Sequence, residues 1–168
     1  MNWLKSLFGK NKIETNHSNL NESEEEIYRT RKGMEIRADE VFEARISNDF
    51  DKMIKAVSIK ADLVDRHFLL QAIIAESYKK RDEDIFKEHC LKHSKIYLSE
   101  VNDLLTALKK EFGELPRVSV FQNYATLLAE LNEFDEAIKV CEIAISFGLK
   151  DGTKGGYESR IERIKKKQ

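Results

Sequence analysis

The chain has 168 residues, enough for one domain, and its 35% charged content stands well above the usual quarter while 41% is hydrophobic. This balance favours helices with one buried stripe, and seven Gly with a single Pro argue against strands joined by tight turns. Residues 13–159 hold 21 basic and 29 acidic residues, a net charge of −8, which argues against a nucleic-acid-binding surface spread over the domain.

Residues 1–8 form a short amphipathic segment. Its apolar side chains fall on one face of a helix and are Trp3, Leu4, Leu7 and Phe8. Such a segment docks on an apolar surface, and three surfaces remain open: the protein's own helices, the groove of a partner, or a membrane interface. Residues 9–22 are polar and lack apolar periodicity, which predicts a flexible linker.

Residues 23–168 show helical spacing throughout, so the expected fold class is all-α. Ser23 is the expected N-cap of the first helix and Asp65 that of the third. The predicted helices are seven, near 23–48, 50–61, 65–78, 84–112, 116–131, 133–147 and 157–167. The breaks between helices are expected near Asn48, Lys80, Gly113, Asn132 and Gly148. Because these breaks are short, neighbouring helices must fold back as antiparallel hairpins.

The helical pair at 121–148 carries large and small side chains in a set order. That order runs Phe121, Tyr124, Ala125, Leu128, Asn132, Phe134, Ala137 and Ala144. The pattern resembles the tetratricopeptide repeat, in which small residues let two antiparallel helices approach closely. Two details differ from the family: Asn132 replaces the usual Gly of the turn, and Leu149 replaces the closing Pro.

Two upstream pairs, at 68–98 and 34–62, share only the outline of this repeat. A single repeat cannot bury its own faces, so the resemblance implies about three stacked units and a cap. The expected architecture is a short tetratricopeptide-like solenoid of antiparallel helical hairpins spanning residues 23–168. The helix at 157–167 is its expected C-terminal capping helix.

The resemblance also implies a partner site, because in this family the first helix of each hairpin lines the concave face. The residues expected on that face are Gln71, Lys79, Gln122, Asn123, Thr126 and Glu130. An Asn at the place of Asn123 often helps to hold an extended peptide in this family. Only Lys79 is placed to bind a terminal carboxylate, so an internal or helical peptide is expected. The alternative is that this face is solvated and the partner binds elsewhere.

The sequence HCLKH places His89 and His93 one helical turn apart, a spacing that can chelate zinc beside Cys90. No Glu lies between the histidines, so the general base of a metalloprotease is missing. Cys90 and His93 share an apolar stripe with Phe86 and Tyr97. This favours a core histidine with one ring nitrogen satisfied by a neighbour over a metal ligand.

Together these patterns predict a non-catalytic interaction module or adaptor that binds a protein or peptide and needs no cofactor. Cys90 and Cys141 fall in apolar-periodic segments and are expected as buried thiols of a cytoplasmic protein. One alternative is a peripheral membrane-associated adaptor that uses residues 1–8. A second is a metal-dependent enzyme that uses His89 and His93. The identity of the partner and the oligomeric state stay open.

Overall fold

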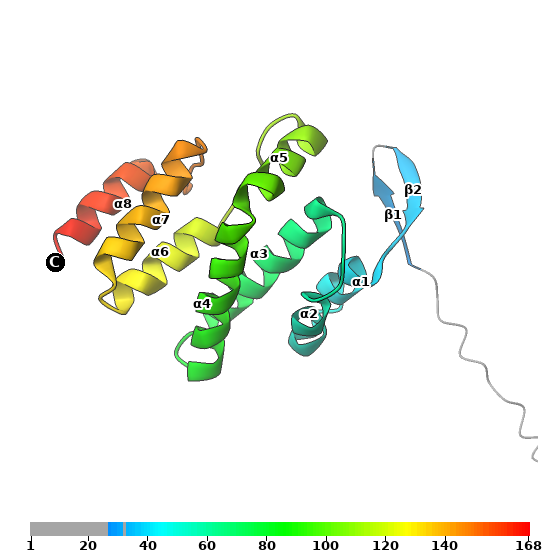
Figure 1. Cartoon of the computed structure of the whole chain (residues 1–168), viewed down its shortest axis with the longest axis horizontal. Helices are drawn as coiled ribbons and strands as arrows, with labels where there is room; N and C mark the ends of the chain where they lie inside the picture. The colour runs from blue at the N-terminus through cyan, green and yellow to red at the C-terminus, as the bar shows by residue number, and fades with distance from the viewer. Residues whose placement is uncertain (1–26, 32) are drawn as a thin grey trace, which may run out of the picture.

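The computed structural model describes residues 27–31 and 33–168, and within them the protein is predominantly helical (Figure 1). The strands are β1 (Tyr28–Arg31) and β2 (Met34–Arg37), and the helices are α1 (Glu40–Ile46), α2 (Phe50–Ala56), α3 (Leu63–Lys79), α4 (Asp84–Ser99), α5 (Val101–Phe112), α6 (Val120–Glu130), α7 (Phe134–Ser146) and α8 (Gly156–Lys165). The helices form a row along the long axis, from α1 and α2 beside the strands to α8 at the far end. The predicted amphipathic segment and linker, 1–8 and 9–22, lie outside the described residues.

The β1–β2 hairpin corrects the first part of the helix predicted over residues 23–48, of which only α1 is helical. Ser23, the expected N-cap, lies outside the described residues. The two strands of the hairpin pair antiparallel, and Gly33 takes a left-handed φ of 76° in the turn between them, a conformation that favours glycine. Ile27, Met34 and Val41 follow one another at intervals of seven residues. This interval matches two turns of a helix, but it is equally compatible with residues that lie in a hairpin and in the helix after it. Ile27, just before β1, and Met34, in β2, are exposed, and only Val41, in α1, is buried.

The predicted helix breaks are confirmed. Asn48, Gly113, Asn132 and Gly148 all take left-handed φ values, between 56° and 80°, at positions where a helix ends. Glycine and, less often, asparagine adopt this conformation at low cost, which is why these residue types predict a break. Lys80 is the C-cap of α3, also as expected.

The start of α3 differs from the prediction. Asp62, rather than Asp65, is the N-cap, and its carboxylate accepts a hydrogen bond from the Val64 amide at 2.9 Å. Asp65 lies in the first turn and is only 2% exposed. Both positions hold an aspartate, a preferred N-cap residue, so residue type alone does not distinguish them.

The single helix predicted at 84–112 is wrong, because the structure has two helices that meet at Glu100. The Glu100 carboxylate pairs with the guanidinium of Arg66 on α3, with Arg66 Nη2 donating at 2.7 Å. Tyr97 and Leu104, on either side of the break, are both fully buried. The apolar spacing therefore continues through the break, so the sequence pattern does not indicate it.

The core divides into two clusters that share helix α3. The smaller packs α1 and α2 against α3 and contains Val41, Ala44, Met53, Ala56, Leu69 and Ile73. The larger runs from the opposite side of α3 to α8. At its end α8 packs on α7 through Tyr157 and Ile164, 1% and 4% exposed, in the position predicted for a terminal helix.

Candidate functional site

Three of the residues predicted to bind a partner follow one flank of α6. Gln122, Thr126 and Glu130 are four residues apart, and Asn123 lies beside them. Glu130 is exposed and the other three are half-buried. The structure therefore places these four side chains along one helix, partly open to solvent.

Thr126 is part of a partly buried polar network that ties α6 to α8. Arg160 Nη1 donates to Thr126 Oγ1 at 2.8 Å, and its other nitrogens donate to Asp151 Oδ2 at 3.0 and 3.2 Å. Thr153 donates twice to Asp151 Oδ1, from its amide and its hydroxyl. Burial acts to raise the pKa of Asp151, but the hydrogen bonds from Thr153 and Arg160 outweigh burial and hold this pKa below its usual value.

Two more of the predicted residues also hold the helices together. The Glu130 carboxylate accepts from Arg81 Nε at 2.7 Å and Nη2 at 3.0 Å, which links α6 to the turn after α3. Gln71 Oε1 accepts a hydrogen bond from the Ser119 amide at 3.0 Å, which fixes the loop that enters α6. These side chains have structural partners, so a peptide would have to share them.

Lys79 lies apart from the α6 flank. It is exposed, contacts Glu76 at 3.6 Å, and lines a separate hollow of about 340 Å³ beside α2. Asn123, by contrast, has no side-chain hydrogen bond to any residue that the structure describes. On the α6 flank, Asn123 and Gln122 are therefore the most available to a ligand.

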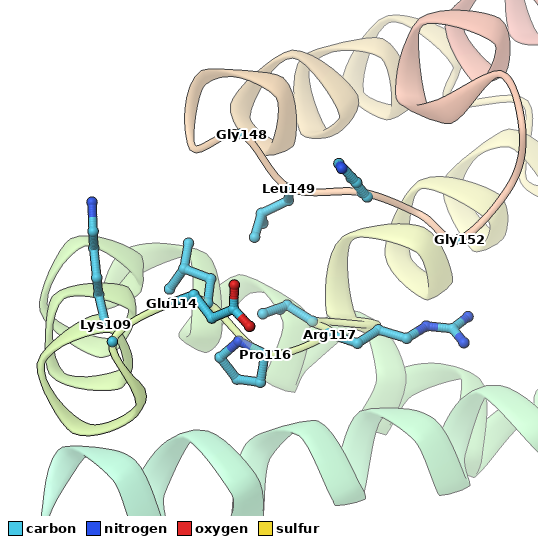
Figure 2. A pocket seen from close by; sticks show the side chains of 11 residues that line it. Lys109, Glu114, Pro116, Arg117, Gly148, Leu149 and Gly152 are labelled. Atoms are coloured by element: carbon cyan, nitrogen blue, oxygen red, sulfur yellow. The ribbon is translucent and has the colours of Figure 1, made fainter.

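A larger cleft lies next to the α6 flank, where two loops meet (Figure 2). Residues 113–118 lead from α5 into α6 and form one wall, and residues 148–152 follow α7 and form the other. The cleft holds about 580 Å³. Leu115, Pro116 and Leu149 give it apolar walls. Its size is in the range of small-ligand and side-chain pockets.

The cleft is predominantly cationic. Lys109, Arg117 and Lys150 line it against a single carboxylate, that of Glu114, and none of the four forms an ion pair with another residue in the described part of the chain. Figure 2 shows the Glu114 carboxylate pointing into the cleft and Arg117 extending towards Gly152. Gly152 takes a left-handed φ of 79°, which favours glycine, and a Cβ added there would lie in ordinary van der Waals contact with the Arg117 guanidinium, 3.4 Å away.

Arg117 connects the cleft to the α6 flank. Its Nη2 lies 3.5 Å from Gln122 Oε1, at the outer limit of a hydrogen bond. The cleft and the exposed side of α6 thus form one continuous surface. We call the two together the cleft surface, defined by Lys109, Glu114, Arg117, Gln122, Asn123 and Lys150.

The three cations of this surface were not among the residues predicted to bind a partner. Lys109, Arg117 and Lys150 are distant in sequence and belong to no motif. A signal was nevertheless present, because the helix-ending residues Gly113 and Gly148 are 35 residues apart. This distance is close to the length of one helical-hairpin unit, and successive units bring equivalent loops side by side.

Two of the described histidines, His67 and His93, lie in the core. His93 is 1% exposed and its Nδ1 donates to the His89 carbonyl at 2.8 Å, which confirms a core histidine with one satisfied nitrogen. His67 is fully buried, with its Nδ1 hydrogen-bonded to Tyr97 Oη at 2.8 Å, and burial lowers its pKa to about 4. In the described residues no three His, Cys, Asp or Glu side chains are arranged to hold a metal.

Both cysteines lie in the core, as expected. Cys90 and Cys141 are fully buried free thiols, and burial raises the pKa of each to about 11. Thiols of this kind stay protonated at neutral pH and are poor nucleophiles. They contribute to packing and not to the cleft surface.

In comparisons with known proteins, no family model, no curated protein and no solved structure matched the chain. Over the residues that the structure describes, every helix is too short or too polar to cross a bilayer.

Proposed function

We propose that this protein is a non-catalytic adaptor in which a short tetratricopeptide-like array binds an acidic segment of a partner protein. The α6–α7 hairpin supports the array, since Ala125 and Ala137 are fully buried where its helices pack and Asn132 forms its left-handed turn. Helix α6 also packs on both α3 and α4, as a helix does when one hairpin stacks on the preceding one.

The cleft surface is the observation that carries the proposal. Three cations without ion-pair partners among the described residues line a cleft in a body whose residues 13–159 carry a net charge of −8. Unpaired cations attract carboxylates, and the negative surroundings repel acidic chains that cannot reach the cleft. The apolar walls at Leu115, Pro116 and Leu149 can hold a hydrophobic side chain of the same segment.

Beside the cleft, Asn123 and Gln122 offer amide groups that bond to a peptide backbone without reading its sequence. Specificity then comes from charge and from the apolar walls, and affinity is modest because the surface is small. Two buried, unpaired thiols suit a reducing compartment such as the cytoplasm, where we place this activity.

The test is selection of peptides from a displayed random library on the full-length protein, followed by affinity measurements. We expect the selected peptides to be rich in Asp and Glu. Their affinity should fall at least about tenfold for Arg117→Glu, because a reversed charge in the cleft replaces attraction by repulsion. Lys139→Glu is the matched control, since Lys139 is an exposed cation on α7, 64% exposed, and does not line the cleft.

If the selected peptides bind wild type and Arg117→Glu with equal affinity, the cleft is not part of the binding site. Equal losses in Arg117→Glu and Lys139→Glu would mean that net charge, and not the cleft, drives binding. Selection of peptides without acidic residues would contradict the proposed chemistry of the partner.

A further inference from the structure

A second hollow lies at the opposite end of the helical row, between α1 and α2. It holds about 580 Å³, and its apolar lining consists of Ile27, Ala44, Ile46, Ala56 and Ile59. We call it the N-terminal groove. Among the described residues no helix or strand fills it. It is separate from the cleft surface, so its occupant does not depend on the proposed function.

The groove has the shape of a helix-packing site. Its least exposed lining residues are Ala44 and Ala56, 8% and 2% exposed, which form a floor of small side chains. Ile46 and Ile27, 42% and 37% exposed, stand at its edges. Small residues between larger ones let another helix approach closely, as Ala125 and Ala137 do in the α6–α7 hairpin.

The two ends of the row differ in what covers them. At the C-terminal end, α8 packs on α7 and buries Tyr157 and Ile164. A row of stacked hairpins needs such a cap at both ends, since each hairpin leaves one face without a neighbour. Among the residues that the structure describes, none caps the N-terminal groove in this way.

We propose that the chain's own residues 3–8 dock in the N-terminal groove and cap this end of the row. Trp3, Leu4, Leu7 and Phe8 supply an apolar helix face of the kind that the groove accepts. A volume of about 580 Å³ holds several large side chains.

The point at which the described chain begins supports this occupant. Ile27 lines the groove itself, so the preceding residues start at its edge. The connection of residues 9–26 has a root-mean-square span of roughly 23 Å if it behaves as a flexible chain, far more than the distance needed. A tether of this length gives the segment an effective concentration in the millimolar range, so even weak docking is well populated.

Charge favours one orientation of this occupant. Residues 1–12 carry three lysines and no acid. The α1 side of the groove presents Glu40 and Glu43, which have no ion-pair partner within the described residues, whereas the α2 side presents Lys52 and Lys55. Lys5 and Lys10 lie off the apolar face of the segment and can pair with these carboxylates at the rim, where such pairs add orientation more than affinity.

Trp3 makes the proposal directly testable, because it is the only tryptophan in the chain. Tryptophan emission and acrylamide quenching of the dilute full-length protein are compared with those of a peptide of residues 1–12. We expect blue-shifted, protected emission in the protein. Ile46→Glu should shift the docking equilibrium towards the open form by about tenfold or more, since it places a charge in the apolar wall.

Ile85→Glu is the matched control, because Ile85 is an isoleucine of α4 that is 56% exposed and lies outside the groove. The Trp3 emission of this variant should equal that of the wild-type protein. Ile27→Glu, which places a charge at the other apolar edge of the groove, should also expose Trp3, and it serves if Ile46→Glu loses its circular dichroism signal.

If Trp3 in the wild-type protein has the same emission and quenching as Trp3 in the free peptide, the proposal is overturned. Protection of Trp3 that vanishes on dilution would also overturn it and would assign the groove to a second copy of the chain. Protection that arises only with phosphatidylserine vesicles would assign the segment to a membrane. Protection of Trp3 that is unchanged in both Ile46→Glu and Ile27→Glu would place the segment elsewhere on the protein.

Discussion

The buried ion pair between Asp151 and Arg160 should contribute strongly to the attachment of α8. The Asp151 side chain is fully buried and that of Arg160 is 14% exposed. Removing one partner of a buried pair typically costs about 3–5 kcal/mol, because the other charge is left uncompensated. Arg160 keeps its bond to Thr126 and some solvent contact, so Asp151→Asn should lower the free energy of unfolding by about 2–3 kcal/mol.

Urea unfolding followed by circular dichroism measures this loss, and a double-mutant cycle with Arg160→Met isolates the pair. We expect a coupling energy of about 2 kcal/mol for Asp151 and Arg160. The exposed pair Glu136–Lys139, with side chains 50% and 64% exposed, is the control and should couple by no more than about 0.5 kcal/mol. Equal coupling energies for the two pairs would refute the reasoning from burial.

Two further predictions concern the core. Ala137 is fully buried between α6 and α7, so Ala137→Leu should destabilise the fold by about 1–3 kcal/mol through overpacking. A variant with the melting temperature of wild type would show that the two helices are not tightly packed there. The folded protein keeps His67 neutral down to a pKa of about 4, whereas the unfolded chain protonates near 6.5. Lowering the pH from 7 to 5 should therefore reduce the free energy of unfolding by about 2 kcal/mol through this group. His67→Gln should lessen that pH dependence in urea titrations, and an identical pH dependence in both proteins would contradict the assignment.

The helical breaks could be predicted because their cause is local. Asn132 and Gly148 end helices through a backbone conformation that their own side chains permit, whatever surrounds them. The β1–β2 hairpin could not be predicted in this way, because its apolar residues are few and their spacing also fits a helix. The break at Glu100 is hidden for a different reason: its stabilising partner, Arg66, lies 34 residues earlier.

The candidate site was predictable only in part. The sequence places Gln122 and Asn123 on a helix flank, and the structure has them there. It does not reveal that Arg117 and Lys150 line one cleft, since this depends on which two loops lie side by side. Nor does it reveal that Gln71 is engaged by a backbone amide 48 residues later. Both facts are set by how hairpins stack, which residue spacing within one helix cannot show.

The hydrogen bond from the Ser119 amide to Gln71 links a wall of the cleft to a helix that does not line it. A ligand that orders residues 113–118 would thereby restrain α3 as well. Occupancy of the cleft should then slow amide hydrogen exchange in the middle of α3, although the ligand never touches that helix. In the wild-type protein, hydrogen exchange in α3 would therefore report whether the cleft is filled. Gln71→Leu removes the hydrogen-bond acceptor, so in this variant a bound ligand should no longer slow exchange in α3.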